Sequence, residues 1–180
     1  QYVETINCYD SFVAEAECKK IIDYCEENRL FDRSGVGVGT STLLTKARTS
    51  FSAKILDREG FKKVFEKVSQ TLSCNIDQIE NLQCVRYYPG QEYRPHFDSG
   101  GNTIRKETLL IYLNDDFTGG ETYFPEINYT VLPRKGSCLH FKNLDDNLNI
   151  QPQSVHAGLP VHSGVKYACN IWVSPHAIKK

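Results

Sequence analysis

The stretch from residue 86 to residue 98 reads Arg-Tyr-Tyr-Pro-Gly-Gln-Glu-Tyr-Arg-Pro-His-Phe-Asp. At its end, His96 and Asp98 stand two positions apart. Residues i and i+2 of an extended strand point to the same face, so this spacing predicts an imidazole and a carboxylate side by side. Both groups bind transition metals, and the pair therefore supplies two ligands of a candidate metal site.

His156 is the candidate third ligand, because it lies near the end of a later segment with β character. An isolated His-x-Asp pair is more often structural, with satisfied hydrogen bonds. In a jelly roll, however, strands that are far apart in sequence face each other across the barrel mouth, so His156 can join His96 and Asp98. Two histidines and one carboxylate suit Fe(II) with positions left open, and they also suit zinc.

Lys166 favours iron over zinc. Most lysines are solvated, but an iron-bound 2-oxoglutarate needs a buried cation for its distal carboxylate, and an ammonium group provides one. The strand expected over residues 165–173 presents alternate residues on two faces. One face is apolar and is expected to pack in the core. The other holds Lys166 and the only tryptophan, Trp172, and is expected to line a cofactor pocket.

Periodicity predicts the arrangement of the remaining elements. Apolar residues recur with the helical period over 11–29 and 58–73, and Asp10 or Ser11 can cap the first helix. From residue 81, short β segments alternate with turns, and strands are expected over 82–88, 108–113, 121–124, 129–132, 137–141, 154–156 and 165–173. This pattern indicates an antiparallel barrel or jelly roll. We expect one α+β domain over residues 1–180, with an N-terminal helical layer on a jelly-roll core.

Composition excludes several other classes of protein. The chain has 180 residues, of which 40% are hydrophobic, so a folded core is expected rather than disorder. A formal net charge of −1 gives no basic field for nucleic acid or a membrane surface, and no apolar run is long enough to span a bilayer. The chain begins at Gln1 and contains no methionine, so we expect that an N-terminal segment has been removed. Secretory (endoplasmic reticulum) and cytoplasmic locations both stay open.

The seven cysteines contain no CxxC pair, which argues against a structural zinc site. An odd number leaves at least one cysteine unpaired within the chain. Cys18 and Cys25 are seven residues apart on one helical face and are expected to be small buried hydrophobes. A fully reduced set and one or two disulfides agree equally well with the composition.

As an ordered set, these segments resemble the prolyl 4-hydroxylases of the Fe(II)/2-oxoglutarate oxygenase superfamily, most closely over residues 80–174. The matching pieces are Glu80–Tyr93, His96-Phe-Asp98, Thr108–Asn114, Gly119–Pro125, His156, Lys166 and Trp172. The resemblance implies a double-stranded β-helix (jelly roll) with supporting helices. It also implies that His96, Asp98 and His156 bind iron, and that the 2-oxoglutarate pocket is formed by Lys166, Tyr87 and Trp172.

The resemblance further implies a peptide groove made by Arg48, Ser50, Glu80, Tyr93, Arg105 and Trp172. The glycine-rich stretch 34–40 resembles the hinge of a substrate-closing lid, and a plain flexible loop is an equal alternative. Ser174 stands where some relatives have a peptide-contacting histidine. Oxygen-sensing prolyl hydroxylases typically have arginine at the position of Lys166, so the lysine resembles the collagen-type, plant, algal, viral and bacterial enzymes.

The activity that the resemblance implies is hydroxylation of proline at C4 in a peptide or protein. The reaction consumes O2 and 2-oxoglutarate, releases succinate and CO2, and uses ascorbate as supporting reductant. Other interpretations stay open: an oxygenase of the same scaffold that acts on another side chain or a small molecule, a non-catalytic peptide-binding module, or a zinc hydrolase. Turnover of 2-oxoglutarate that is stimulated by proline peptides would distinguish the hydroxylase. The oligomeric state is not predicted.

Overall fold

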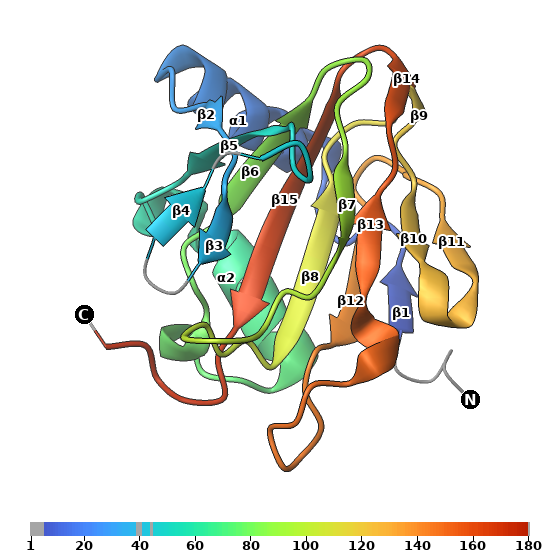
Figure 1. Ribbon diagram of the computed structural model, residues 1–180. Coiled ribbons are helices and arrows are strands. Elements are labelled where there is room, and N and C mark those ends of the chain that lie inside the picture. Colours follow the sequence, from blue (N-terminus) through green and yellow to red (C-terminus); the bar gives the residue numbers. More distant parts are fainter. Residues whose placement is uncertain (1–5, 39–40, 44, 180) are drawn as a thin grey trace.

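The computed structural model describes residues 6–38, 41–43 and 45–179 (Figure 1). Its helices are α1 (Glu15–Glu27) and α2 (Lys62–Leu72), with short 3-10 helices η2 (Glu59–Phe61), η3 (Ile76–Gln78), η4 (Pro125–Ile127) and η5 (Pro152–Ser154). The strands are β1 (Ile6–Tyr9), β2 (Asp32–Arg33), β3 (Val36–Val38), β4 (Ser41–Leu43), β5 (Phe51–Lys54), β6 (Gln83–Tyr87), β7 (Tyr93–His96), β8 (Glu107–Tyr112), β9 (Thr118–Gly119), β10 (Thr122–Phe124), β11 (Tyr129–Val131), β12 (Cys138–Lys142), β13 (His156–Gly158), β14 (Val161–Ser163) and β15 (Lys166–Val173). Within the described residues, no helix is both long and apolar enough to span a bilayer.

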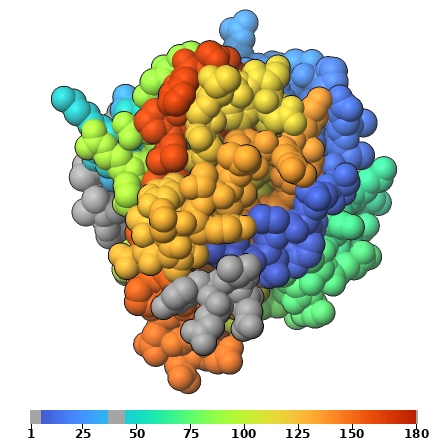
Figure 2. Space-filling view, turned by 90° about the vertical axis from the view of Figure 1, so that its right-hand side faces the viewer, coloured from blue at the N-terminus to red at the C-terminus, as the bar shows by residue number. Residues whose placement is uncertain are grey.

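Two antiparallel sheets form the jelly roll. The larger one has seven strands in the order β1-β12-β8-β15-β6-β5-β2, and the smaller has four in the order β11-β10-β13-β7. The small sheet lies in front of the large one, and both long helices lie behind the large sheet (Figure 1). In the side view, β10 and β11 form the surface next to the edge strand β1 (Figure 2). This arrangement confirms the predicted fold class.

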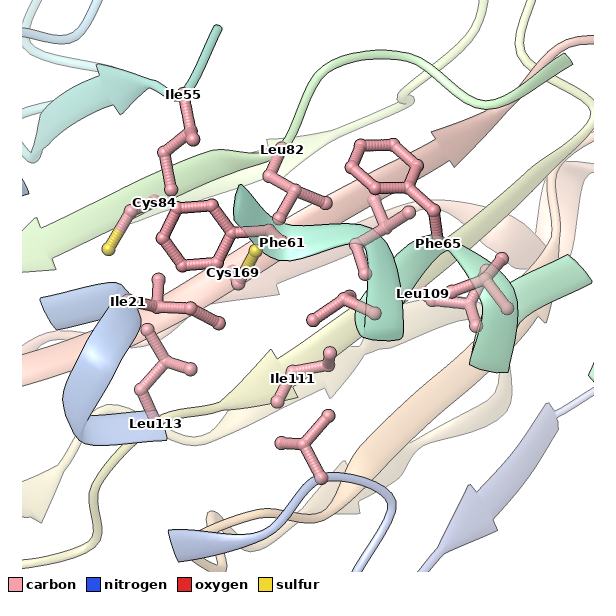
Figure 3. Packing of buried hydrophobic residues seen from close by; sticks show 14 of the residues in the cluster. Ile21, Ile55, Phe61, Phe65, Leu82, Cys84, Leu109, Ile111, Leu113 and Cys169 are labelled. Carbon is pink, nitrogen blue, oxygen red and sulfur yellow. The ribbon is translucent and has the colours of Figure 1, made fainter. Parts of the chain in front are cut away.

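The main core lies between the large sheet and the two helices. Helix α1 buries Ile21, α2 buries Phe65, and these residues belong to one cluster with Leu109, Ile111 and Cys169 of the sheet (Figure 3). Burying one large apolar side chain contributes about 1.5–3 kcal/mol to folding. Because the helices cover the apolar outer face of the large sheet, the inner face can carry the polar side chains that line a cavity.

Most predicted elements are confirmed, with three corrections. The expected strand 154–156 is wrong, because residues 152–154 form η5 and β13 begins at His156. The expected cap at Asp10 or Ser11 is also wrong: the N-cap of α1 is Ala14, and Ser11 lies in the left-handed region with φ 51°. The expected strand ranges did not include β1, β2, β3, β4, β5, β7, β9 and β14, which have only two to four residues each and show too little alternation to be recognised. His96 and Asp98 were expected on one extended strand, but β7 ends at His96.

The cysteines and the glycine-rich stretch can also be placed. All seven cysteines lie in the described part of the chain as free thiols, and Cys18 and Cys25 are buried, as predicted. Within 34–40, residues 36–38 form β3, which pairs with β4 as a hairpin. Gly39 and Thr40 lie outside the described residues, and the hinge stays a prediction.

Candidate active site

Three predicted metal ligands converge where β7 meets β13. His96 is the last residue of β7, His156 is the first residue of β13, and the two are direct partners across the antiparallel pair. Asp98 follows β7 and places its Oδ1 3.3 Å from the Nε2 atoms of both histidines. Ligand atoms of all three residues lie within 4.8 Å of one another. The geometry can therefore hold one metal ion.

Hydrogen bonds orient both imidazoles towards this point. Nδ1 of His96 lies 2.8 Å from the carbonyl oxygen of Arg94, and Nδ1 of His156 lies 2.8 Å from that of Ser154. A carbonyl only accepts hydrogen bonds, so each Nδ1 has the proton. Each Nε2 then presents its lone pair to the place where the metal ion would bind, between the two histidines and Asp98. The ring of Tyr93 stacks on that of His96 with 3.4 Å between centroids, which fixes the imidazole plane.

The charges of the three groups also suit a divalent cation. Burial raises the pKa of Asp98, but His156 and His96 lower it by more, so the net pKa lies well below the ordinary value and the carboxylate is ionised. Burial and the neighbouring His156 lower the pKa of His96, which is therefore a neutral ligand at neutral pH. Burial lowers the pKa of His156, but Asp98 raises it by more, so a proton competes with the metal for this imidazole more strongly than for a free histidine.

Lys166 is buried on the inner face of β15, as its alternation predicted. Its Nζ donates to the carbonyl oxygen of Gly120 at 2.8 Å, which uses one of the three ammonium protons. Gly120 has φ 69°, and a Cβ there would lie 3.1 Å from Cδ of Lys166, so glycine makes room for the lysine. Burial lowers the pKa of Lys166 to about 8, which leaves a cation that favours an anionic ligand.

The three candidate metal ligands and Lys166 line one cavity of about 400 Å³, which lies in the size range of small-molecule sites. Tyr87 lines this cavity, with Nζ of Lys166 4.8 Å from its ring centroid. Burial raises the pKa of Tyr87, so its phenol is a neutral hydrogen-bonding group. Trp172 lines the cavity on the same face of β15 as Lys166, and the arrangement suits a chelating acid with a second carboxylate.

The predicted peptide-contacting residues fall into two groups. Arg48, Tyr93, Arg105 and Trp172 all line the cavity. Ser50 is fully buried, and its Oγ donates to Oγ of Ser34, so it is placed behind the cavity wall. Glu80 pairs with Arg105 at 2.8 Å and is not among the lining residues. The structure thus gives Ser50 and Glu80 contacts with other protein groups.

Two polar residues that the sequence did not single out extend from Asp98 in a chain of hydrogen bonds. Thr108 donates to its Oδ2 at 2.7 Å, and Asn143 donates to Oγ1 of Thr108 at 2.8 Å. Thr108 is on the same face of β8 as Leu110, a cavity residue, so strand alternation contained a signal for it. Asn143 follows β12 in a polar loop, and its position depends on the tertiary fold.

Comparison with known proteins agrees with this site. The sequence model of the 2OG-Fe(II) oxygenase superfamily matches residues 82–174, just over half of the chain. The chain belongs to this superfamily. A putative prolyl 4-hydroxylase of Acanthamoeba polyphaga mimivirus is 34% identical, in an alignment that covers 91% of this chain and 71% of that protein. Prolyl 4-hydroxylase 5 of Arabidopsis thaliana is 28% identical, with coverage of 95% and 68%.

Solved structures show the same fold. The viral collagen prolyl hydroxylase of Paramecium Bursaria Chlorella virus-1, in its 2-oxoglutarate complex, matches with a TM-score of 0.76 and 27% identity, over 94% of this chain and 95% of that chain. A prolyl hydroxylase of Trichoplax adhaerens, in complex with a hypoxia-inducible-factor peptide fragment, matches with a TM-score of 0.74 and 18% identity, over 94% and 83%. The second likeness concerns the fold alone.

The assignment of His96 as a metal ligand predicts that His96→Ala weakens Fe(II) binding by more than about 100-fold, because loss of an outer partner alone costs about 10–100-fold. Anaerobic Fe(II) titration of the purified variant measures this. His162→Ala removes an exposed histidine and is the matched control, with unchanged affinity expected. Equal Fe(II) affinity in the two variants would contradict the ligand assignment.

The depressed pKa of Lys166 predicts a pH effect on use of 2-oxoglutarate. The free site has the ammonium form below about pH 8 and loses it above, so kcat/KM for 2-oxoglutarate should fall as pH rises through about 8, by roughly tenfold per unit. In Lys166→Arg, whose guanidinium stays charged, this decline should disappear, and Lys166→Ala should raise KM at every pH. A decline that persists unchanged in Lys166→Arg would assign it to another group.

Proposed function

We propose that this chain is an Fe(II)- and 2-oxoglutarate-dependent peptidyl-prolyl 4-hydroxylase. The observation that supports it most is the shared cavity, in which His96, Asp98 and His156 lie at one place and the buried ammonium of Lys166 at another. A zinc hydrolase has no need for such a cation. Membership of the oxygenase superfamily and similarity to viral and plant prolyl 4-hydroxylases support the same reaction.

The protein's own groups have separate roles in this proposal. His96, Asp98 and His156 hold the iron, and Lys166 holds the distal carboxylate of 2-oxoglutarate with Tyr87 as a second contact. Iron and 2-oxoglutarate, when bound, supply the oxidant: of the two atoms of O2, one enters succinate as CO2 leaves, and the other enters the C4–H bond of proline. The cavity wall keeps the proline next to the iron and limits the entry of water.

The rim of the cavity suits a proline-containing segment. Such a segment favours the polyproline II conformation, in which backbone carbonyls make no internal hydrogen bonds. Arg48 is buried, stacks on the ring of Tyr93 at 4.4 Å, and has a buried Nε without a partner among the described residues. Its guanidinium can donate to a peptide carbonyl, and Trp172 adds an aromatic surface in the same cavity for a pyrrolidine ring.

The decisive test is mass spectrometry of peptides incubated with the protein, Fe(II), 2-oxoglutarate, ascorbate and O2. The set includes poly-proline, Pro-Pro-Gly repeats and single-proline peptides. We expect a gain of one oxygen on proline with an equal amount of succinate. Succinate without peptide oxidation would instead support an oxygenase of another side chain or a small molecule. Neither product from iron-loaded protein would support a non-catalytic peptide-binding module.

Arg48→Ala is predicted to weaken peptide use specifically. The KM for the peptide should rise about tenfold or more, because a hydrogen bond from a charged group contributes about 1.5–3 kcal/mol. Turnover of 2-oxoglutarate without peptide should be unchanged, since Arg48 is assigned to the peptide and not to the cosubstrate. Arg134→Ala removes an exposed arginine and should leave both quantities unchanged. An unaltered peptide KM in Arg48→Ala would exclude the proposed contact.

A further inference from the structure

We propose that Thr108 and Trp172 act as positioning residues, which hold Asp98 as a one-oxygen ligand of the metal. This inference rests on the proposed iron site and assigns a role to a hydrogen-bonded group around it. The two carboxylate oxygens of Asp98 have different surroundings. Oδ1 faces the Nε2 atoms of His96 and His156, both at 3.3 Å. Oδ2 accepts from Oγ1 of Thr108 at 2.7 Å and from Nε1 of Trp172 at 3.2 Å.

The sheet register places the two donors together. Thr108 of β8 and Trp172 of β15 are direct partners across an antiparallel pair, so their side chains leave the sheet side by side on the same face. Asp98 lies on a different segment, after β7 of the small sheet. The two donors therefore reach across from the large sheet to the carboxylate and tie the two halves of the site together.

The first donor, Thr108, is itself fixed by a hydrogen bond. Nδ2 of Asn143 donates to Oγ1 of Thr108 at 2.8 Å, which occupies a lone pair of the hydroxyl and leaves its proton for Asp98. Thr108 and Asn143 are each 1% exposed, so water does not compete for these bonds. Hydrogen bonds in such a low-dielectric site are stronger than they are in water.

Trp172 is held from its ring face. The guanidinium of Arg105 lies 3.6 Å from the ring centroid, and its Nε donates to Glu80 at 2.8 Å. Arg105 also places Nη1 3.4 Å from the backbone oxygen of Asp98. Glu80 and Arg105, which the sequence assigned to the peptide groove, thus support the indole that donates to the metal ligand.

The consequence concerns the open positions at the metal. A carboxylate that bound through both oxygens would occupy a position that 2-oxoglutarate or O2 requires. Oδ2 accepts one O–H donor, from Thr108, and one N–H donor, from Trp172. Its hydrogen-bonding capacity is thus already used, and the carboxylate cannot rotate without breaking both bonds. Both donors are neutral, so they orient Asp98 without adding a positive charge that would oppose the cation.

The test compares Thr108→Val with Thr108→Ser in a Mn(II) titration followed by EPR, in which free Mn(II) gives the signal. Valine keeps the shape and removes the donor, whereas serine keeps the hydroxyl. We expect Thr108→Val to bind Mn(II) about 10–100-fold more weakly than wild type, and Thr108→Ser to be close to wild type. Thr71→Val is the matched control, with unchanged Mn(II) affinity expected, since the Thr71 hydroxyl donates to the backbone oxygen of Lys67 in α2 and Thr71 does not line the cavity.

The outcomes separate this inference from the proposed function. Equal Mn(II) affinity of folded Thr108→Val, Thr108→Ser and wild type would overturn the positioning role while leaving the hydroxylase proposal intact. Wild type that binds no Mn(II) would overturn both. Should Thr108→Val fail to fold by circular dichroism, Trp172→Phe removes the second donor, and wild-type Mn(II) affinity in that variant overturns the proposal. Weaker Mn(II) binding without peptide hydroxylation in wild type would support the positioning role and reject the substrate.

Discussion

The direct pairing of His96 with His156 across β7 and β13 is the constraint on which the rest of the site depends. Strand side chains alternate between faces, so a register slip of one residue would turn one imidazole away from the other. β13 is also paired with β10 on its other side, which fixes its position within the small sheet. Once this register is set, Asp98 needs only the short extension beyond β7 to complete the ligand set.

The large sheet supports the site because its two faces have opposite chemistry. On β15, Cys169 and Ile171 pack in the main core with the two helices, while Lys166 and Trp172 face the cavity. The helices thus give apolar burial on one side and leave the other side for groups whose burial is unfavourable. Burial of Lys166 lowers its pKa to about 8, an unfavourable state that a bound carboxylate would relieve. Apolar burial in the main core offsets the free energy that burial of the Lys166 ammonium costs.

Sequence reasoning predicted what depends on local spacing. The inward face of Lys166 and the buried positions of Cys18 and Cys25 follow from periods of two and of about 3.6, whereas Asp98 lies beyond the end of β7 and reaches His96 through the path of the chain after that strand. It failed where tertiary contacts decide. The contact of Thr108 with Asp98 requires the register between β8 and β15 together with the path of the chain after β7, whereas the peptide role expected for Ser50 stays a prediction. Helix α1 begins at Glu15 and not at residue 11, because Ser11 has a left-handed backbone conformation that the sequence pattern does not reveal.

Arg105 would link metal binding to the proposed peptide binding in this cavity. It lines the cavity, where a peptide would meet it, and its guanidinium also lies against the ring of Trp172, whose Nε1 donates to Asp98. A peptide group that pulled Arg105 away from Glu80 would loosen the support of that indole, whereas one that packed on Arg105 would tighten it. Because Trp172 donates to Asp98, a peptide in the proposed groove would shift this metal ligand through Arg105 and Trp172, without any direct contact between peptide and metal.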